Sequence, residues 1–422
     1  MNKIPSGFFA LFAILLTPTL SHAQDATDDL KSWSLSGYGT LGYSNDGSQT
    51  LGFVRDLSQS GDTTVKGNWR PDSRIGVQFA NRFSPQSEAV VQAVLRDKSE
   101  TTLDNSIEWA FIALRPTPGL NLRLGRVGID FFLLSDYRNL GYAQTTVRPN
   151  WDFYGFLPLY SMDGADVAYT FNAADARWNL KTQIGQSKVD LPIADSAFNL
   201  EAKQFIDFSL TREAGPWRHK LALATMKAPN EAPLGQLTGP LAGIAALGIP
   251  GISGEAANLV KRLSFKDART KYLAVGGSYD DGSWLVQSEL SYVSGSREIF
   301  VNGVAGYLTV ARRIGSATPF VGISGHRPSH AAKLAENDWS PLGAEAVILQ
   351  STAVRGATSG RINQQTLTVG TRWELSAQSA VKLQWDRIRV RQNGYGLWSA
   401  APQNLMTGEQ QNVLSAALDW IF

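Results

Sequence analysis

Apolar residues recur at every second position in many short stretches of the chain. The clearest is residues 411–422, in which Leu414, Leu418, Trp420 and Phe422 fall on one face and small or polar residues fall between them. Because a strand places successive side chains on opposite faces, this period of two predicts a strand with one apolar face. A bare C-terminal Phe is explained if the strand closes a barrel whose outer face lies in lipid. The alternative is the last strand of a soluble β-sandwich.

The same alternation recurs along the whole chain, and short turns alternate with long connections. An even number of strands brings both chain ends to one side, so the last strand can pair with the first and leave no open edge. We therefore predict an all-β fold, a transmembrane antiparallel β-barrel of about 16 strands, with fourteen or eighteen as alternatives. The predicted strands are residues 33–43, 74–83, 88–96, 107–114, 120–126, 164–171, 178–184, 205–210, 217–226, 272–279, 284–292, 303–313, 318–324, 366–375, 380–390 and 411–422.

The long connections have separate expected roles. Tight turns on the periplasmic side and extended loops outside are typical of outer-membrane barrels, so we expect external loops at residues 44–70, 227–270, 325–362 and 392–409. Residues 189–201 are also predicted to form a loop. The segment from Val127 to about Met162 lacks clear alternation and is treated separately below.

The N-terminus has the order of a secretory signal peptide. Lys3 precedes an apolar run from Phe8 to Leu16, and Ser21-His22-Ala23 supplies a small-residue cleavage site. We predict cleavage after Ala23, which leaves residues 24–422 as one barrel domain. The chain has no cysteine, which excludes thiol catalysis and zinc–thiolate sites. Its formal net charge of +2 points to no particular partner.

Residues 127–162 are the candidate constriction of the barrel. A barrel of about sixteen strands is too wide for its own side chains to fill, so it encloses an aqueous channel that something must narrow. Phe131, Phe132 and Leu133 could pack this segment against the inner wall, and an external loop with self-packed aromatics is the alternative. The pore-lining candidates from this segment and its end are Asp130, Asp136, Arg138, Arg148, Asp152, Tyr154 and Asp163.

Several strings of residues resemble the Gram-negative outer-membrane porins. They are S-G-Y-G-T at 36–40, L-R-L-G-R-V-G-I-D at 122–130, F-L-L-S-D at 132–136, N-L-G-Y-A-Q at 139–144, V-R-P-N-W-D-F-Y at 147–154, and the terminal strand ending in Phe. The match departs at Asn150, where the family's V-R-P-P-x-x-x-Y motif has a second proline. The resemblance implies a diffusion channel, commonly a homotrimer, whose third loop forms the eyelet.

Basic residues are expected on the wall that faces this loop. Rings of charge inside a pore set its ion selectivity. Because the inward bases outnumber the loop acids, we predict a weak anion preference. Arg82 and Arg96 lie at strand ends, where rim positions are the simpler interpretation. The remaining wall candidates are Arg74, Arg123, Arg126, Arg372, Lys382 and Arg389.

The insertion at residues 233–252 is apolar and rich in glycine and proline. We predict a short helix from Ser253 to Leu263 after it, with Ser253 as the N-cap. An exposed apolar loop must bury itself somewhere. We predict a partial lid on the mouth, which would make residues 227–270 the gate of a substrate-specific channel; contact with a neighbouring subunit is the alternative.

Other classes of function have little support in the sequence. After the signal peptide only His219, His326 and His330 remain, and no serine is convincingly placed beside them for a hydrolase. We expect surface histidines, no enzyme, no metal, no cofactor and no nucleic-acid partner. The expected partners are the lipid bilayer, lipopolysaccharide, and small hydrophilic solutes or ions. A non-conducting structural or adhesive barrel is the remaining alternative.

Overall fold

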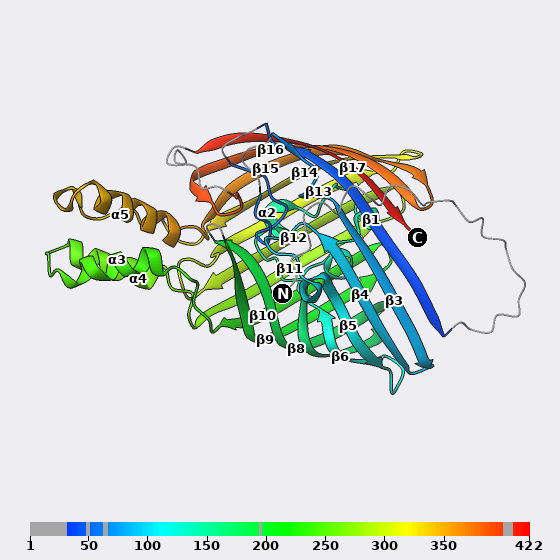
Figure 1. Ribbon diagram of the computed structural model, residues 1–422. Coiled ribbons are helices and arrows are strands. Elements are labelled where there is room, and N and C mark those ends of the chain that lie inside the picture. Colours follow the sequence, from blue (N-terminus) through cyan, green and yellow to red (C-terminus); the bar gives the residue numbers. More distant parts are fainter. Residues whose placement is uncertain (1–31, 48–50, 62–65, 194–195, 400–407) are drawn as a thin grey trace, which may run out of the picture.

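The predicted alternation is present as a closed antiparallel barrel in the computed structural model (Figure 1), which describes residues 32–47, 51–61, 66–193, 196–399 and 408–422. Within these ranges sixteen strands form the wall, and the two-residue β2 (Gly67–Asn68) adds to its edge. The sixteen-strand prediction is confirmed. The wall strands are β1 (Trp33–Asn45), β3 (Arg74–Ser84), β4 (Ser87–Arg96), β5 (Ile107–Leu114), β6 (Leu120–Gly128), β7 (Ser161–Ala173), β8 (Ala176–Ile193), β9 (Ser196–Ala214), β10 (Trp217–Ala228), β11 (Ala268–Asp280), β12 (Trp284–Gly295), β13 (Gly303–Arg312), β14 (Ala317–Pro328), β15 (Ile362–Ser376), β16 (Ser379–Tyr395) and β17 (Glu409–Ile421).

The barrel closes where the first wall strand meets the last. β1 pairs with β17 on one side and with β3 on the other, so neither strand leaves an edge free. Gly37 and Gly39 lie where the rings of Phe422 and Trp420 pass over β1, and a Cβ atom at either glycine would collide with these rings. The glycines in S-G-Y-G-T therefore make room for the terminal aromatic residues.

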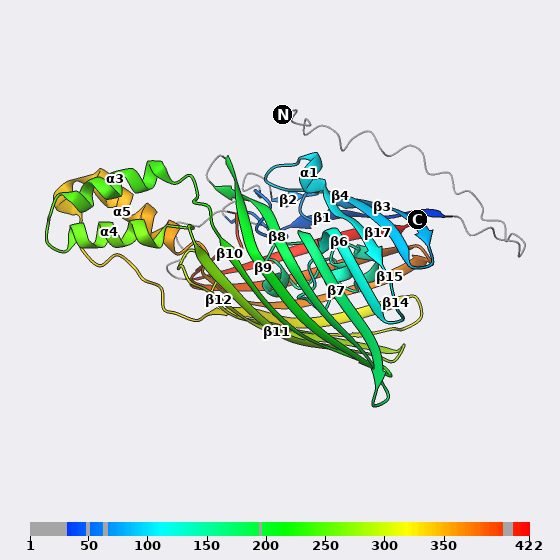
Figure 2. The same cartoon turned by 90° about the horizontal axis from the view of Figure 1, so that it is seen from below.

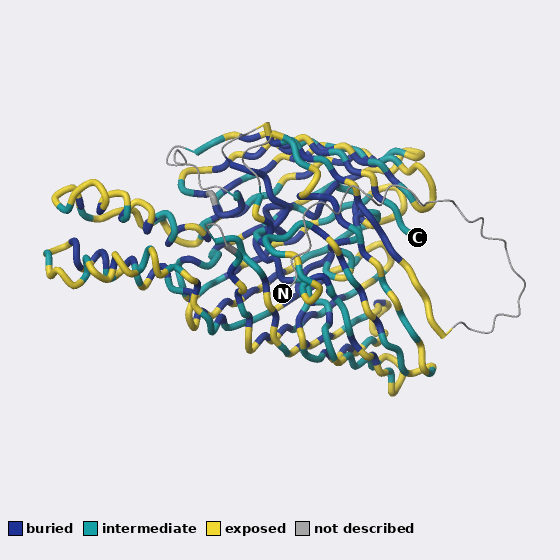
Figure 3. Tube along the Cα trace, viewed as in Figure 1, coloured by how far each residue is buried: buried dark blue, intermediate teal, exposed yellow. Residues whose placement is uncertain are grey.

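The two faces of the wall differ in chemistry. Leu414 on β17 and Phe422 directly after it point outward and are more than half exposed, whereas Ser415 and Asp419 on β17 point inward. The same alternation on the other strands gives the barrel an apolar outer belt, which is the surface that a bilayer requires. The inner face carries most of the buried polar residues, together with apolar residues at the end with the long connections. In Figure 3 much of the chain inside the barrel is dark blue, which marks buried residues.

The connection between β8 and β9 was predicted as a loop at residues 189–201 and is instead a long hairpin. Val189 pairs with Leu200, and the ladder continues to Ile193 and Ser196. The inward-facing Phe198 packs on Phe265, with ring centroids 5.4 Å apart. This local apolar contact extends the strands beyond the part of the chain that has clear alternation.

Two of the predicted external loops turn inward. Leu51 and Phe53 are buried, and Arg55 donates a hydrogen bond of 2.9 Å to the carbonyl of Arg138 inside the barrel. In the first part of the 392–409 connection, Leu397 and Trp398 are also buried, and β16 itself extends to residue 395. Their apolar side chains gain more from burial in the mouth than from exposure outside. Residues 48–50, 62–65 and 400–407 lie outside the described ranges, as does the predicted signal peptide.

The other two long connections form a helical bundle that projects from the barrel (Figure 2). The bundle contains α3 (Gly235–Ala246), α4 (Ile252–Arg262) and α5 (Ala344–Ala357). Its apolar core includes Leu259 and Trp339 and is separate from the core inside the barrel. Both views place the helices leading away from the barrel, and not folded into its mouth as a lid would be.

The helix boundaries differ from those predicted. The N-cap of α4 is Gly251, while the Ser253 hydroxyl donates to the carbonyl of Ile244 and ties α4 to α3. α3 forms although Pro240 and three glycines lie in it, because Leu241 and Ile244 pack against the bundle core. Among the described residues, no helix is long and apolar enough to cross a membrane.

Candidate pore and its inward loop

Residues 129–160, here called the inward loop, lie inside the barrel. The Asp130 N–H donates to Gln183 on β8 (2.9 Å), and the Val147 N–H donates to Gln384 on β16 (2.9 Å). Between these points the Leu133 N–H donates to Glu289 on β12 (2.8 Å). β8 and β16 are on opposite sides of the ring of strands. The segment therefore crosses the interior, and it includes the short helices η2 (Ser135–Tyr137), η3 (Gly141–Ala143) and α2 (Trp151–Tyr154).

Aromatic packing fixes the first part of the inward loop to the wall. The Phe131 ring lies 5.1 Å from the ring of Tyr272 on β11 and 6.3 Å from the ring of Phe205 on β9. Phe132 packs within the loop on Tyr154, with ring centroids 4.7 Å apart. These buried contacts agree with the anchoring role that the sequence predicts for Phe131 and Phe132.

Arg148 anchors the far end of the inward loop through two carboxylates. Its guanidinium contacts Asp72 at 2.5 Å and Asp386 on β16 at 3.1 Å. It also donates to Ser44 (2.9 Å) and Ser415 (2.6 Å) on the two strands that close the barrel. Burial alone would raise the pKa of Asp72, but Arg148 and its hydrogen bonds hold that pKa at about 2. Arg148 is only 2 % exposed, so it is a clamp and not a water-facing residue.

Three basic residues of the wall hold loop carbonyl groups. Lys382 pairs with Asp419 at 2.9 Å and donates to the carbonyls of Gly141 and Thr146. Arg74 donates to the carbonyl of Asn139 (2.6 Å), and Arg372 donates to that of Gln144 (2.9 Å). All three bases face the interior as predicted, but the inward loop covers them.

Three further candidates are buried inside the inward loop or beneath it. Arg138 donates to the carbonyls of Tyr154 and Leu157, which closes the loop on itself. The Tyr154 hydroxyl donates to Glu289 on β12. Asp152 accepts hydrogen bonds from Ser324 and Gln364 on β14 and β15, and burial raises its pKa. These side chains position the loop and do not line open water.

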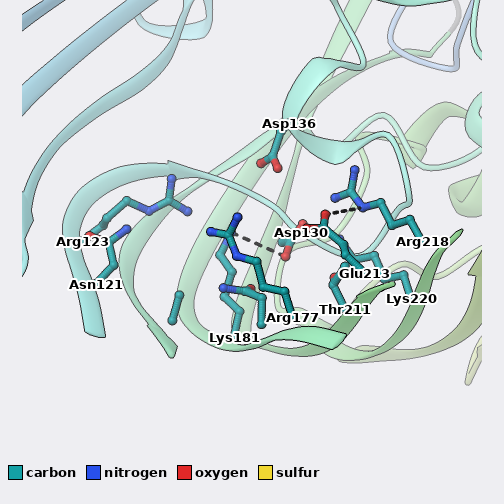
Figure 4. Close-up of a pocket in the computed structure, with 12 residues that line it drawn as sticks. Asn121, Arg123, Asp130, Asp136, Arg177, Lys181, Thr211, Glu213, Arg218 and Lys220 are labelled. Carbon is teal, nitrogen blue, oxygen red and sulfur yellow. Dashed lines mark hydrogen bonds and ion pairs between the residues drawn. The ribbon is translucent and has the colours of Figure 1, made fainter. Parts of the chain in front are cut away.

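An open cavity of about 290 Å³ remains between the inward loop and the strands β6, β8, β9 and β10 (Figure 4). It lies near the end of the barrel that has the short turns, here called the turn end. Arg123 on β6 forms a bidentate ion pair with Asp166, in which Nε donates to Oδ1 (3.0 Å) and Nη2 donates to Oδ2 (2.5 Å). The acids on the lining are Asp130, Asp136 and Glu213, and the bases are Arg123, Arg177, Lys181, Arg218 and Lys220.

Asp130 is the strongest electrostatic contact of the inward loop with this wall. It pairs with Lys220 on β10 and lies 3.6 Å from Lys181 on β8. It also accepts a hydrogen bond of 2.8 Å from Ser209. Burial by itself would raise the pKa of Asp130, but the two lysines outweigh it and lower that pKa well below its usual range. Asp130 therefore remains ionised and neutralises part of the basic wall.

Three predicted pore-lining residues lie on the outer face of the barrel instead. Arg126 pairs with Asp163 at 2.7 Å and with Asp104 at 3.0 Å outside the wall. Arg389 is also exposed on the outer face of β16. The reason is strand parity: Arg126 is three residues from the inward-facing Arg123, and an odd separation places two strand residues on opposite faces.

Parity also identifies inward-facing charged residues that the sequence prediction missed. Trp178 and Leu180 face outward, so Arg177 and Lys181 face the interior. On β10, Leu221 and Leu223 face outward, so Arg218 and Lys220 face the interior. Asp166 is three residues from the outward-facing Asp163, and this odd separation places it inside the barrel. The periodicity was therefore sufficient to find the basic wall. It gave no signal for Asp72, which reaches Arg148 only in the folded chain.

Two residues predicted to lie at the surface or rim are buried. Arg96 points inward, lies 3.4 Å from Asp56 and stacks on the ring of Tyr160. His326 faces inward from β14 and is fully buried beside Phe156, with its Nδ1 atom 3.1 Å from the carbonyl of Ile362. Both contacts involve segments that fold into the barrel, which strand-end position alone does not reveal.

Neither a protein-family model nor a curated protein matches the sequence. Solved structures do match, over nearly the whole chain. The anion-selective porin from Comamonas acidovorans has a TM-score of 0.51 at 12% identity, over 93% of this chain and 99% of that one. Salmonella typhi OmpF in complex with daunomycin has a TM-score of 0.51 at 11% identity, over 92% of this chain and 97% of that one. In-vitro folded Vibrio cholerae OmpT in its trimer form has a TM-score of 0.50 at 11% identity, over 93% of this chain and 100% of that one. The chain has the fold of the Gram-negative outer-membrane porins.

Proposed function

We propose that this protein is an outer-membrane porin that forms a water-filled channel for passive diffusion of small hydrophilic solutes and ions, with a weak anion preference. In this proposal residues 1–23 are removed on export, and the end of the barrel with the long connections, here called the loop end, faces outward. Residues 127–162 restrict the channel.

The observation that carries the anion preference is the charge balance of the 290 Å³ cavity. Its lining has five bases and three acids. Asp130 is shared by Lys181 and Lys220, and Glu213 lies 3.6 Å from Arg218. Arg177 forms no ion pair with a described carboxylate. Asp166 neutralises Arg123, so a small positive excess remains in the path of a solute. One of the solved structures of this fold is described as an anion-selective porin, which is consistent with the proposal.

The test is single-channel recording of the purified protein in a planar bilayer with a KCl gradient. The expected result is stepwise conductance with a reversal potential displaced towards that of chloride. A reversal potential displaced towards that of potassium would overturn the anion preference. Absence of any conductance would overturn the channel itself.

A second candidate is a sealed barrel with a structural role. The inner wall at the loop end carries Ile388, Val390 and Val413, each at most 1 % exposed. They belong to one buried apolar cluster with Leu51 and Leu397 from the two connections that turn inward. This apolar filling of the mouth favours low conductance. The bilayer recording separates the two candidates directly.

The partner proposed for the outer wall is a second and third copy of the chain. Arg126, Asp163 and Asp104 form an ionic cluster on the outer face of the short strands β5 and β6 and their neighbour β7. Charges facing lipid near the middle of the bilayer are costly, and contact with another subunit would remove them from lipid. Native mass spectrometry of the detergent-purified protein is expected to show a trimer; a monomer would contradict this part of the proposal.

A further inference from the structure

Four arginines form an unpaired basic patch on the outer face of the barrel at its loop end. Arg387, Arg389 and Arg391 alternate along β16, and all three are exposed. Arg327 is exposed on the same face of β14. None of the four forms an ion pair with any carboxylate that the structure describes, and the residue of β15 opposite Arg389 is the amide Gln365.

The register fixes the spacing of this patch. Gly325 on β14 pairs with Gln365 on β15, and Gln365 pairs with Arg389 on β16, so the arginines of β14 and β16 flank one strand. Alternate residues of a strand are about 6.6 Å apart, and two strand spacings are about 9.6 Å. The hydrogen bonds of Arg387 to Gln410 and of Arg391 to Gln365 leave further guanidinium N–H donors free to bind a ligand.

The patch begins where the apolar belt ends. Arg387 pairs in register with Leu367, the last large apolar residue on the outer face of β15 towards the loop end. Below it, Leu383 and Leu418 are exposed on β16 and β17. A row of guanidinium groups directly above a lipid-facing surface therefore lies at the level of lipid head groups, while its flanks contact acyl chains.

Two other exposed bases at this end of the barrel are neutralised. Lys203 on β9 lies 2.7 Å from Glu201, and Lys227 on β10 lies 2.6 Å from Asp267. On β11, Arg269 and Lys271 are also exposed and form no ion pair with a described carboxylate. The patch on β14 and β16 is therefore distinguished by its four arginines around one strand, and not by the lack of ion pairs alone. Arginine presents a planar fork that binds phosphate oxygens with two hydrogen bonds, which favours a phosphorylated ligand over a carboxylated one of the same charge.

We infer that this patch, Arg327, Arg387, Arg389 and Arg391, is a binding site for the phosphate groups of lipopolysaccharide in the outer leaflet. The inference rests on the outer-membrane orientation proposed above, but not on conductance. Two or more phosphates on one glycolipid would engage guanidinium groups along β16 and across β15, while its acyl chains cover the apolar face beneath.

The test compares the wild-type protein with the R387Q/R389Q/R391Q variant, both in detergent and titrated with purified lipopolysaccharide. Because each arginine supplies charge-assisted hydrogen bonds to phosphate oxygens, loss of three arginines is expected to weaken binding by about tenfold or more. The matched control is Lys203→Gln, an exposed base at the same end whose charge is already neutralised, and it is expected to bind like the wild type. Equal binding by the triple variant and the wild type would overturn the inference.

Two further arms separate the sources of phosphate and the alternative partner. Lipopolysaccharide treated with phosphatase is expected to bind the wild type as weakly as the intact lipid binds the variant; undiminished binding would overturn the site. Binding of inorganic phosphate as tightly as the intact lipid would also overturn it. If the triple variant binds lipopolysaccharide as the wild type does but has a different oligomeric state, the inference is overturned and the patch instead contacts a second copy of the chain. Bilayer conductance of the variant is expected to equal that of the wild type, so failure here is distinct from failure of the channel proposal.

Discussion

The two sides of the barrel interior carry the same types of charged residue but use them differently. On β3, β16 and β17, Arg74, Lys382 and Asp419 lie beneath the inward loop and have almost no exposed surface. On β8 and β10, Arg177 and Arg218 line an open cavity. One side is a fixed support for the loop, and the other is the wall that a solute would meet.

The difference arises from where the loop and its partners lie, and not from the bases themselves. Arg148 brings a charge from the loop into contact with Asp72 and Asp386, and loop carbonyls occupy the neighbouring donors of Lys382. On the open side, Asp130 is the one loop carboxylate within ion-pair distance of the wall bases among the described residues. An inward-facing base is therefore pore-lining only where the loop leaves it uncovered.

The largest effect is expected at Arg148 on the covered side. Arg148→Met leaves Asp72 and Asp386 buried without a counter-charge, which typically costs about 3–5 kcal/mol. We expect the far end of the inward loop to detach, with lower stability against denaturant and a larger single-channel conductance.

The control for this variant removes the two carboxylates that lose their counter-charge. Adding Asp72→Asn and Asp386→Asn to Arg148→Met is expected to recover a substantial part of the lost stability, because no unpaired charge then remains in the interior. If Arg148→Met alone were as stable and as conducting as the wild type, the clamp would not hold the loop.

A smaller effect is expected from the open side. Arg177→Gln combined with Arg218→Gln removes two of the five bases of the cavity. A unit charge about 8 Å from an ion in water contributes roughly 0.5 kcal/mol, or about twofold in relative permeability, so each substitution should shift the reversal potential towards potassium by that amount. Arg372→Gln is the matched control, because the loop covers Arg372 and its loss should leave the reversal potential unchanged. Equal shifts from both variants would abolish the distinction between the sides.

How much of this arrangement could be predicted from the sequence depends on the kind of contact. Alternation located all sixteen wall strands, because lipid outside and polar interior impose a period of two on each strand separately. The faces of Arg126 and Arg389 could also have been predicted from the sequence, because Arg126 is an odd number of residues from Arg123 and Arg389 is an odd number from Lys382. The prediction neglected this and placed both on the wrong face. Periodicity carries no information on the third dimension. The pairing of Arg148 with Asp72 and Asp386, which are 76 and 238 residues away, follows only from where the loop folds.

The helical bundle shows the same limit. α3 contains Pro240 and lacks any charged residue, so local propensity argued against a helix. Its stability depends on Leu259 of α4 and Trp339 near α5, which lie in two connections that are distant in sequence. Tertiary packing between loops overrode propensity, and the resulting bundle points away from the mouth, where the apolar composition alone suggested a lid.

The smallest effect concerns two acids of the inward loop on opposite sides. Burial raises the pKa of Asp152, which has no base within ion-pair distance among the described residues, while Lys181 and Lys220 overcome burial and lower the pKa of Asp130. A raised carboxyl pKa means that the stability from this group is present at low pH and is lost as the pH rises through the folded-state value. Asp152→Asn should therefore stabilise the protein at pH 8 but not at pH 4, by a fraction of the Arg148 effect.

For Asp130 the sign is opposite: its contribution to stability is complete at neutral pH and is lost only as the pH falls through its lowered pKa, so Asp130→Asn should destabilise the protein at pH 8. Denaturant unfolding followed by tryptophan fluorescence at both pH values measures each difference, and the same sign for both variants would contradict the assignment of one acid to a charged wall and the other to a neutral one.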